Sequence, residues 1–196
     1  MQERVLKNNE HIIFGNVETS LSVTSYAYRK RQRLELAKNM NAWTKGFNLF
    51  LTFKFAQGTL MNEAMALKIY SKFWNKMDRL WYSTPQIKSE FRIPRISYKH
   101  MGSSGSNIHM HALVRAYDPV VFNNVAVNIW SSCDKFTQDL HIGRIRNLEA
   151  SNLYLAHEFS LLGSDTFLPE FTHIANSDVP PKKSMSQLKR ILKNYT

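Results

Sequence analysis

The stretch FRIPRISYKHMGSSGSNIHMHALVRAY, from residue 91 to residue 117, contains two strand-like segments on either side of a turn. Residues 91–101 and residues 108–117 are rich in the aromatic and β-branched side chains that favour β-strands. Residues 102–107 are glycine, serine and asparagine, which is the composition of a turn. The stretch therefore predicts a β-hairpin, and Pro94 favours an edge or bulge position for its first strand.

Two histidines of this hairpin, His109 and His111, are two positions apart on the second strand, so both face the same side of the sheet. A tight turn centred on residues 104–105 pairs His100 with His109 and adds a third imidazole to that face. Three imidazoles on one sheet face form a candidate site for a divalent metal ion. A loop with another offset would turn His100 to the other face, and Glu90 is then the alternative third ligand.

The segments around the hairpin alternate between strand and helix patterns, and Asn62 and Asp118 are candidate helix caps. In chain order we expect a strand at 47–55, a helix at 62–82, the two hairpin strands, a helix at 119–135, a strand at 139–146, a helix at 150–162 and a last strand at 166–174. This order predicts an α+β fold in which a central antiparallel sheet of about five strands carries packed helices. We expect a domain at 47–175, a basic N-terminal extension at 1–46 that packs on it or flanks it, and a basic C-terminal tail at 176–196.

The chain is strongly basic. Its 196 residues include 26 lysines and arginines against 15 aspartates and glutamates, a formal net charge of +11. A soluble domain of this charge most often binds a polyanion such as nucleic acid. The candidate phosphate contacts come from the basic segment 24–45 and from the predicted strands: Arg29, Lys30, Arg31, Arg33, Lys45, Lys99, Arg144 and Arg146.

The cysteine count and the absence of certain motifs exclude several classes of protein. The single cysteine, Cys133, rules out an intrachain disulfide and a cysteine-based zinc finger. The sequence has no P-loop or GxGxxG motif, no apolar run of transmembrane length and no signal-peptide pattern. We therefore expect a cytoplasmic protein without a membrane partner.

A second group of polar side chains lies on the predicted helix at residues 150–162. Tyr154, His157 and Glu158 occupy positions i, i+3 and i+4 and so share one helix face. A tyrosine on a short helix usually packs at the rim of a core with its hydroxyl satisfied by a neighbour. The same arrangement can also present a nucleophile with its helpers, because tyrosine acts as a covalent nucleophile once its phenol is activated.

Three segments, in this order along the chain, resemble the motifs of HUH endonucleases: FLTF at residues 50–53, HMH at 109–111 and YLAH at 154–157. The layout over residues 47–174 is most similar to the single-tyrosine replication initiators (Rep) of phages, plasmids and small single-stranded DNA viruses. The resemblance implies a ferredoxin-like or RRM-like Rep endonuclease fold.

The resemblance also implies an activity: site-specific, metal-dependent nicking and joining of single-stranded DNA, which starts rolling-circle replication. His109, His111 and His100 would hold Mn²⁺ or Mg²⁺, which polarises the scissile phosphate. Tyr154 would attack phosphorus and leave a 5′-phosphotyrosine and a free 3′-OH. The implied partners are single-stranded DNA or an origin hairpin and, because no helicase P-loop follows, a host helicase and polymerase. For a phage or plasmid protein the compartment is the bacterial cytoplasm.

The chain departs from the family pattern Tyr-x-x-Lys at His157, which stands where the lysine is expected. A histidine supplies positive charge there only when it is protonated, and a neutral His157 would instead bind the metal or accept a proton. Tyr154 and His157 are therefore the expected catalytic residues.

Three other interpretations remain open at the level of the sequence. The first is a non-catalytic module that holds single-stranded nucleic acid by stacking and phosphate contacts. The second is a related HUH relaxase or a single-tyrosine transposase, although relaxases typically place the tyrosine ahead of the histidines and Tyr154 follows them. The third is a basic scaffold or regulator that keeps the fold without the activity.

Overall fold

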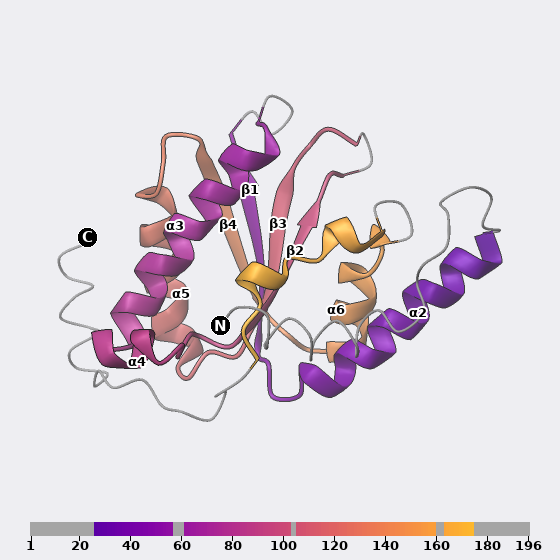
Figure 1. Ribbon diagram of the computed structural model, residues 1–196, viewed down its shortest axis with the longest axis horizontal. Helices are drawn as coiled ribbons and strands as arrows, with labels where there is room; N and C mark the ends of the chain where they lie inside the picture. Colours follow the sequence, from indigo (N-terminus) through magenta and orange to yellow (C-terminus); the bar gives the residue numbers. More distant parts are fainter. Residues whose placement is uncertain (1–25, 57–60, 103–104, 160–162, 175–196) are drawn as a thin grey trace.

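Four antiparallel strands form an open sheet with the order β2-β3-β1-β4. They are β1 (Leu49–Phe55), β2 (Arg95–His100), β3 (His109–Val114) and β4 (Thr137–Arg144). The computed structural model describes residues 26–56, 61–102, 105–159 and 163–174, and helices lie on both faces of its sheet (Figure 1). The α+β architecture with an antiparallel sheet is the one that the sequence predicts.

The hairpin of β2 and β3 has the predicted register. His100 is paired with His109, and Tyr98 is paired with His111. Because paired residues of neighbouring strands point to the same side, the three hairpin histidines share one sheet face. Pro94 directly precedes β2, which is an edge strand of the sheet, so the missing backbone donor of proline costs no ladder bond.

One face of the sheet is covered by α3 (Glu63–Trp81) and α5 (Pro119–Ser131) (Figure 1). The side chain of Asn62 accepts a hydrogen bond from the backbone N–H of Met65 and caps α3. The side chain of Asp118 accepts from two backbone N–H groups and caps α5. Both helices therefore begin where the sequence predicts, since a cap satisfies amides that the first helical turn leaves unpaired.

The core on this face is built around Phe53 of β1. Its ring centroid lies 4.9 Å from the ring centroids of Tyr70 and Phe73 on α3, and 5.0 Å from that of Trp130 on α5. All four side chains are essentially inaccessible to solvent. Their edge-to-face packing fixes both helices against the middle of the sheet.

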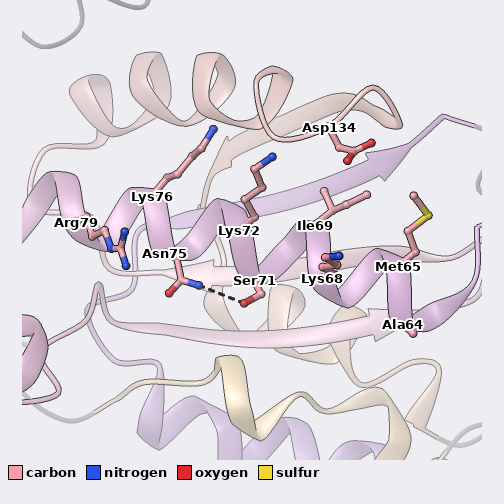
Figure 2. Close-up of a pocket in the computed structure, with 10 residues that line it drawn as sticks. All are labelled: Ala64, Met65, Lys68, Ile69, Ser71, Lys72, Asn75, Lys76, Arg79 and Asp134. Carbon is pink, nitrogen blue, oxygen red and sulfur yellow. Dashed lines mark hydrogen bonds between the residues drawn. The ribbon is translucent and has the colours of Figure 1, made fainter.

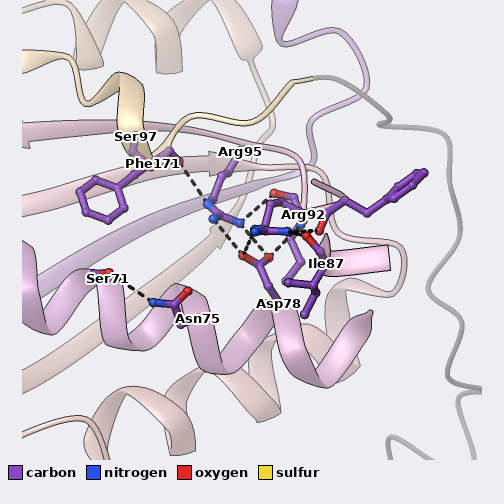
Figure 3. Close-up of polar contacts among 10 residues, drawn as sticks. Ser71, Asn75, Asp78, Ile87, Arg92, Arg95, Ser97 and Phe171 are labelled. Carbon is purple, nitrogen blue, oxygen red and sulfur yellow. Dashed lines mark hydrogen bonds and ion pairs between the residues drawn. The ribbon is translucent and has the colours of Figure 1, made fainter. Parts of the chain in front are cut away.

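A buried ion pair joins α3 to the start of β2 (Figure 3). Both carboxylate oxygens of Asp78 accept from the Arg95 guanidinium, at 2.9 and 3.0 Å, and the Asp78 carboxylate also accepts from the backbone N–H of Ile93. Arg92 lies 3.7 Å from the same carboxylate. The Arg95 guanidinium also lies 4.2 Å from the centroid of the Trp74 ring. The short helix α4 (Thr84–Lys88) lies in the connection between α3 and β2.

The opposite face carries α2 (Tyr26–Trp43) and α6 (Leu148–Leu155) (Figure 1). Met40 of α2 is completely buried, and its sulfur lies 3.1 Å from the Tyr98 hydroxyl of β2. The Arg33 side chain donates two hydrogen bonds to the Leu153 carbonyl oxygen and so ties α2 to α6. Residues 26–43 of the expected basic extension thus contribute a helix to the core of the domain.

Two expectations of strand structure need correction. The sheet has four strands within the described residues, where the sequence predicts about five. The expected last strand at 166–174 forms two 3₁₀ turns, Gly163–Thr166 and Pro169–Phe171, with isolated bridges from Phe167 and His173 to β2. Pro169 explains the difference, because a proline at the start of the second turn has no N–H to donate to a continuous ladder.

The basic tail at 176–196 and residues 1–25 of the expected extension lie outside the described residues. None of the described helices combines the length and the apolar character that crossing a bilayer requires.

Candidate functional site

The three hairpin histidines lie together on the sheet face that α2 and α6 share. His100 and His111 have exposed fractions of 0% and 1%, and His109 is half-buried. The ring centroid of His111 lies 4.6 Å from that of His100 and 4.9 Å from that of His109. One ring nitrogen from each histidine lies within 4.8 Å of the others, so the three can act as ligands of one ion. We call this cluster the histidine triad: His100, His109 and His111.

Hydrogen bonds to backbone carbonyls decide the tautomers of two triad rings. A carbonyl oxygen can only accept, so the ring nitrogen that contacts it carries the proton. His109 Nδ1 donates to the Asn107 carbonyl at 2.9 Å, which places the lone pair of this ring on Nε2. His100 Nε2 donates to the Leu155 carbonyl at 3.0 Å, which places its lone pair on Nδ1. Histidines that bind metals typically have this kind of outer-shell support.

The buried rings also carry nitrogen atoms that find no hydrogen-bond partner among the described residues. His111 Nδ1 lies 3.0 Å from the Thr52 hydroxyl oxygen, but its Nε2 is buried and unsatisfied, as is His100 Nδ1. An unsatisfied buried polar atom costs about 1–3 kcal/mol. A metal ion between the rings would satisfy both atoms, so the residues present fit such an ion.

Burial holds two of the imidazoles in the neutral form. Desolvation lowers the pKa of His100 to about 4, although the Glu158 carboxylate opposes the shift. Desolvation also lowers the pKa of His111 well below its ordinary value, with the neighbouring rings of His100 and His109 acting in the same direction. Neutral imidazole is the form that binds metals, so both side chains can act as ligands at neutral pH.

The alternative third ligand, Glu90, lies away from the triad. It is exposed in the turn after α4, with a left-handed backbone conformation (φ 64°). This turn precedes β2, whereas His100 is the last residue of that strand. The observed register therefore selects His100 over Glu90 as the third ligand of the candidate site.

Tyr154 of α6 lies beside the triad. Its ring centroid is 5.4 Å from that of His111, 6.1 Å from that of His100 and 5.8 Å from that of Phe50 on β1. The side chain is 48% exposed, so a solvent-borne substrate can reach the phenol. Asn147 positions the helix by accepting a hydrogen bond from a backbone N–H of its first turn.

His157 and Glu158 follow α6 rather than continuing it, because the helix ends at Leu155 where the sequence predicts helix to 162. The His157 ring nevertheless lies 5.1 Å from the Tyr154 ring and 4.7 Å from the His100 ring. The buried Glu158 carboxylate accepts from the backbone N–H groups of Met101 and Gly102, at 2.6 and 3.0 Å. Glu158 thus holds the start of the hairpin loop, a role that helical spacing did not suggest.

The expected phosphate contacts are distributed over several surfaces. Lys99 is buried on the face of α3, where its amine forms an ion pair with Glu63 at 2.7 Å. Arg33 is occupied by the Leu153 carbonyl. The Arg29 side chain lies outside the described part of the structure. The remaining candidates are exposed on the surface of the described residues: Lys30, Arg31, Lys45, Arg144 and Arg146.

Two further residues, which the sequence pattern does not single out, share the face of the triad. Lys54 of β1 is exposed and paired with His109, and His141 of β4 is exposed and paired with Thr52. Their strand positions were predictable, but their place beside the triad depends on the pairing of β1 with β3 and β4.

A separate basic groove lies on the opposite face of the sheet, along α3 (Figure 2). Its volume is about 1010 Å³. Lys72 and Lys76 reach across it to backbone carbonyls of Cys133 and Ser132, beyond the end of α5. The lining residues are Ala64, Met65, Lys68, Ile69, Ser71, Lys72, Asn75, Lys76, Arg79 and Asp134. Part of its positive charge therefore stabilises the end of a helix.

Comparison with known proteins finds no counterpart. No family model matches the chain, and no curated protein and no solved structure matches it.

Proposed function

We propose that the chain is a metal-dependent endonuclease that nicks and rejoins single-stranded DNA through Tyr154 and so starts rolling-circle replication. The supporting observation is the juxtaposition of an exposed phenol with three imidazoles that can share one ion. The Tyr154 and His111 ring centroids are 5.4 Å apart, and the three candidate ligand atoms lie within 4.8 Å of one another.

The proposed reaction is an exchange of phosphodiester bonds. The Tyr154 oxygen loses its proton and forms a bond to phosphorus while the bond from phosphorus to the 3′ oxygen breaks. The released 3′ oxygen takes up a proton. Attack by the 3′-OH in the reverse direction rejoins the strand and regenerates the phenol.

A divalent ion in the triad, Mn²⁺ or Mg²⁺, would polarise a phosphate oxygen and offset charge that develops in the transition state. The side chains have separate tasks in this scheme. Thr52 and the backbone carbonyls orient the imidazoles, and α6 presents Tyr154 toward them. His157 lines the same space, and its Nδ1 donates to the Tyr154 carbonyl.

The surface near Tyr154 supports a single-stranded substrate. Phe50 and Tyr154 offer aromatic rings on the sheet face, and Lys54 offers a cation beside His109. A β-carbon added at Gly143 of β4, the residue paired with Phe50, would meet no atom within 4 Å. Aromatic rings beside a cation are suited to flexible, unpaired nucleotides.

The finer parts of the proposal rest on the resemblance of the three sequence motifs to those of Rep proteins. They are a ferredoxin-like or RRM-like Rep fold, an origin strand or hairpin as substrate, and a host helicase and polymerase as partners in the cytoplasm.

A covalent-adduct assay tests the proposal. Wild type and Tyr154→Phe are incubated with single-stranded oligonucleotides, including the origin strand, in Mn²⁺ or in EDTA, and the products are separated on a denaturing gel. We expect a nuclease-sensitive adduct, located on Tyr154 by mass, that requires Mn²⁺ and is absent from the Phe variant. Tyr117→Phe is the matched control, because Tyr117 is 68% exposed and precedes α5, away from the triad.

Two results would count against the proposal. An adduct that persists in Tyr154→Phe would remove the assignment of the nucleophile. Tight binding of the origin strand without any adduct would favour a non-catalytic module that holds single-stranded nucleic acid.

A further inference from the structure

A buried carboxylate faces the triad from the side of α6. Glu158 is 3% exposed, and its two oxygens accept hydrogen bonds from two backbone amides of the hairpin loop. Among the described residues, the ionisable side chains within 4.0 Å of this carboxylate are His100 and His157. A buried carboxylate is costly without a compensating positive charge.

In the neutral form that binds metals, the two imidazoles place lone pairs, and not protons, toward this carboxylate. His100 Nε2 donates to the Leu155 carbonyl, so the lone pair is on Nδ1, which lies 4.0 Å from Glu158 Oε1. His157 Nδ1 donates to the Tyr154 carbonyl, so the lone pair is on Nε2, which lies 3.6 Å from the same oxygen. Three electron-pair donors converging in this way repel one another unless a cation lies between them.

The separation of the three donors matches metal coordination. One donor atom from each of His100, His157 and Glu158 lies within 4.8 Å of the other two. Ligands about 2.1 Å from a tetrahedral ion are about 3.4 Å apart, so the observed distances of 3.6 and 4.0 Å need only a small contraction. Both imidazoles also have the outer-shell backbone carbonyl that metal-binding histidines use.

We propose that His100, His157 and Glu158 form a second binding site for a divalent transition-metal ion. Two imidazoles and one carboxylate suit Zn²⁺, Mn²⁺ and Co²⁺ better than Ca²⁺ or Mg²⁺. The site shares His100 Nδ1 with the triad, so the two sites compete for one lone pair. A bound divalent ion would more than cancel the Glu158 charge and leave a net positive charge beside Tyr154. The proposal goes beyond strand cleavage and does not depend on it.

Cobalt binding to the full-length protein tests the proposal, because Co²⁺ absorption reports both affinity and ligand environment. His109→Ala removes one ligand of the triad alone and lies at its half-buried rim. If only the triad bound metal, this variant would lose Co²⁺ and His157→Ala would bind normally. With the second site present, we expect His109→Ala to retain Co²⁺, and His109→Ala/His157→Ala to bind it at least about tenfold more weakly than His109→Ala does.

His141→Ala is the control, since His141 is an exposed histidine on the same sheet face that belongs to neither cluster. Circular dichroism in EDTA establishes that each variant is folded. His109→Ala/Glu158→Gln supplies a second test if the His157 variant is unstable, and we expect the same loss.

Two outcomes would overturn the proposal. The first is that folded His109→Ala fails to bind Co²⁺. The second is that His109→Ala/His157→Ala or His109→Ala/Glu158→Gln binds Co²⁺ as tightly as His109→Ala does. Because neither readout uses DNA, the second site can fail while the adduct on Tyr154 forms, and the reverse also holds.

Discussion

The ring of Tyr154 lies 5.4 Å from the ring of His111, centroid to centroid and nearly perpendicular to it, although one belongs to α6 and the other to β3. The contact exists because α6 packs over the hairpin end of the sheet, where the Leu155 carbonyl accepts from His100. The same backbone contact therefore sets both the orientation of a candidate ligand and the position of the candidate nucleophile. Metal binding and the placement of Tyr154 are expected to be coupled.

Replacing His100 should weaken metal binding more than replacing any other histidine, because both candidate sites use its Nδ1. At a free Mn²⁺ concentration about one hundred times the dissociation constant, binding stabilises the folded wild type by about 2.7 kcal/mol. We expect Mn²⁺ to raise the melting temperature of the wild type and to have little effect on His100→Gln. Thermal unfolding with Mn²⁺ and with EDTA measures the difference.

His141→Gln is the matched variant and should respond to Mn²⁺ as the wild type does. An equal Mn²⁺-induced shift in His100→Gln would show that the ion binds elsewhere.

The metal-free protein should lose stability as the pH falls below about 6.5. Burial lowers the pKa of His100 to about 4, and burial, followed by the charges of Arg95 and Arg92, lowers the pKa of His173 to about 3. Between these values and 6.5 the unfolded chain binds more protons than the folded chain. The free energy of unfolding therefore decreases as the pH falls through this window, and the contribution of these groups is complete above it.

Urea unfolding in EDTA at several pH values between 7 and about 4.5 measures this dependence. His173→Gln should show a shallower dependence than the wild type, because it removes one of the groups that must stay neutral in the folded state. A His173→Gln protein with the wild-type slope would contradict the assignment.

The local sequence predicts the histidine triad because hairpin geometry is a short-range property. Turn residues between two strand-like segments place His100 opposite His109, and alternation along β3 then adds His111. The prediction of a last strand at 166–174 was wrong for an equally local reason. The backbone at Pro169 has no N–H with which to continue a ladder of hydrogen bonds along the strand.

The side chains that lie around the triad depend on contacts between distant segments. Glu158 reaches the hairpin loop only because the chain leaves helical geometry after Leu155, and a helical pattern extended to residue 162 hides that turn. Lys54 and His141 reach the triad face through the pairing of β1 with its two neighbours. Lys99 looks like a surface cation in the sequence, but β2 turns it toward α3 and Glu63.

The ion pair of Asp78 with Arg95 should be far more sensitive to mutation than the pair of Glu63 with Lys99. Both side chains of the first pair are 3% exposed, so Asp78→Ala leaves a buried guanidinium unpaired and should cost about 3–5 kcal/mol. In the second pair Lys99 is 9% exposed, but Glu63 is 50% exposed and Glu63→Gln keeps an oxygen that can accept from the Lys99 amine, so this variant should cost less than Asp78→Ala. Urea unfolding at pH 7 compares the two variants. Similar losses for both would mean that burial does not set the strength of these pairs.

Lys54 should contribute to binding of single-stranded DNA, and Lys68 should not. Both amines are exposed, but Lys54 lies on β1 beside His109, whereas Lys68 lines the groove along α3 on the opposite face. If Lys54 contacts one phosphate, Lys54→Ala should reduce the slope of log affinity against log salt concentration by about 0.7. Lys68→Ala removes the same charge and should leave the slope unchanged. Fluorescence anisotropy with a labelled oligonucleotide at several salt concentrations measures both. A larger effect at Lys68 would move the strand to the face of α3, away from Tyr154, and would separate the DNA-binding surface from the candidate nucleophile.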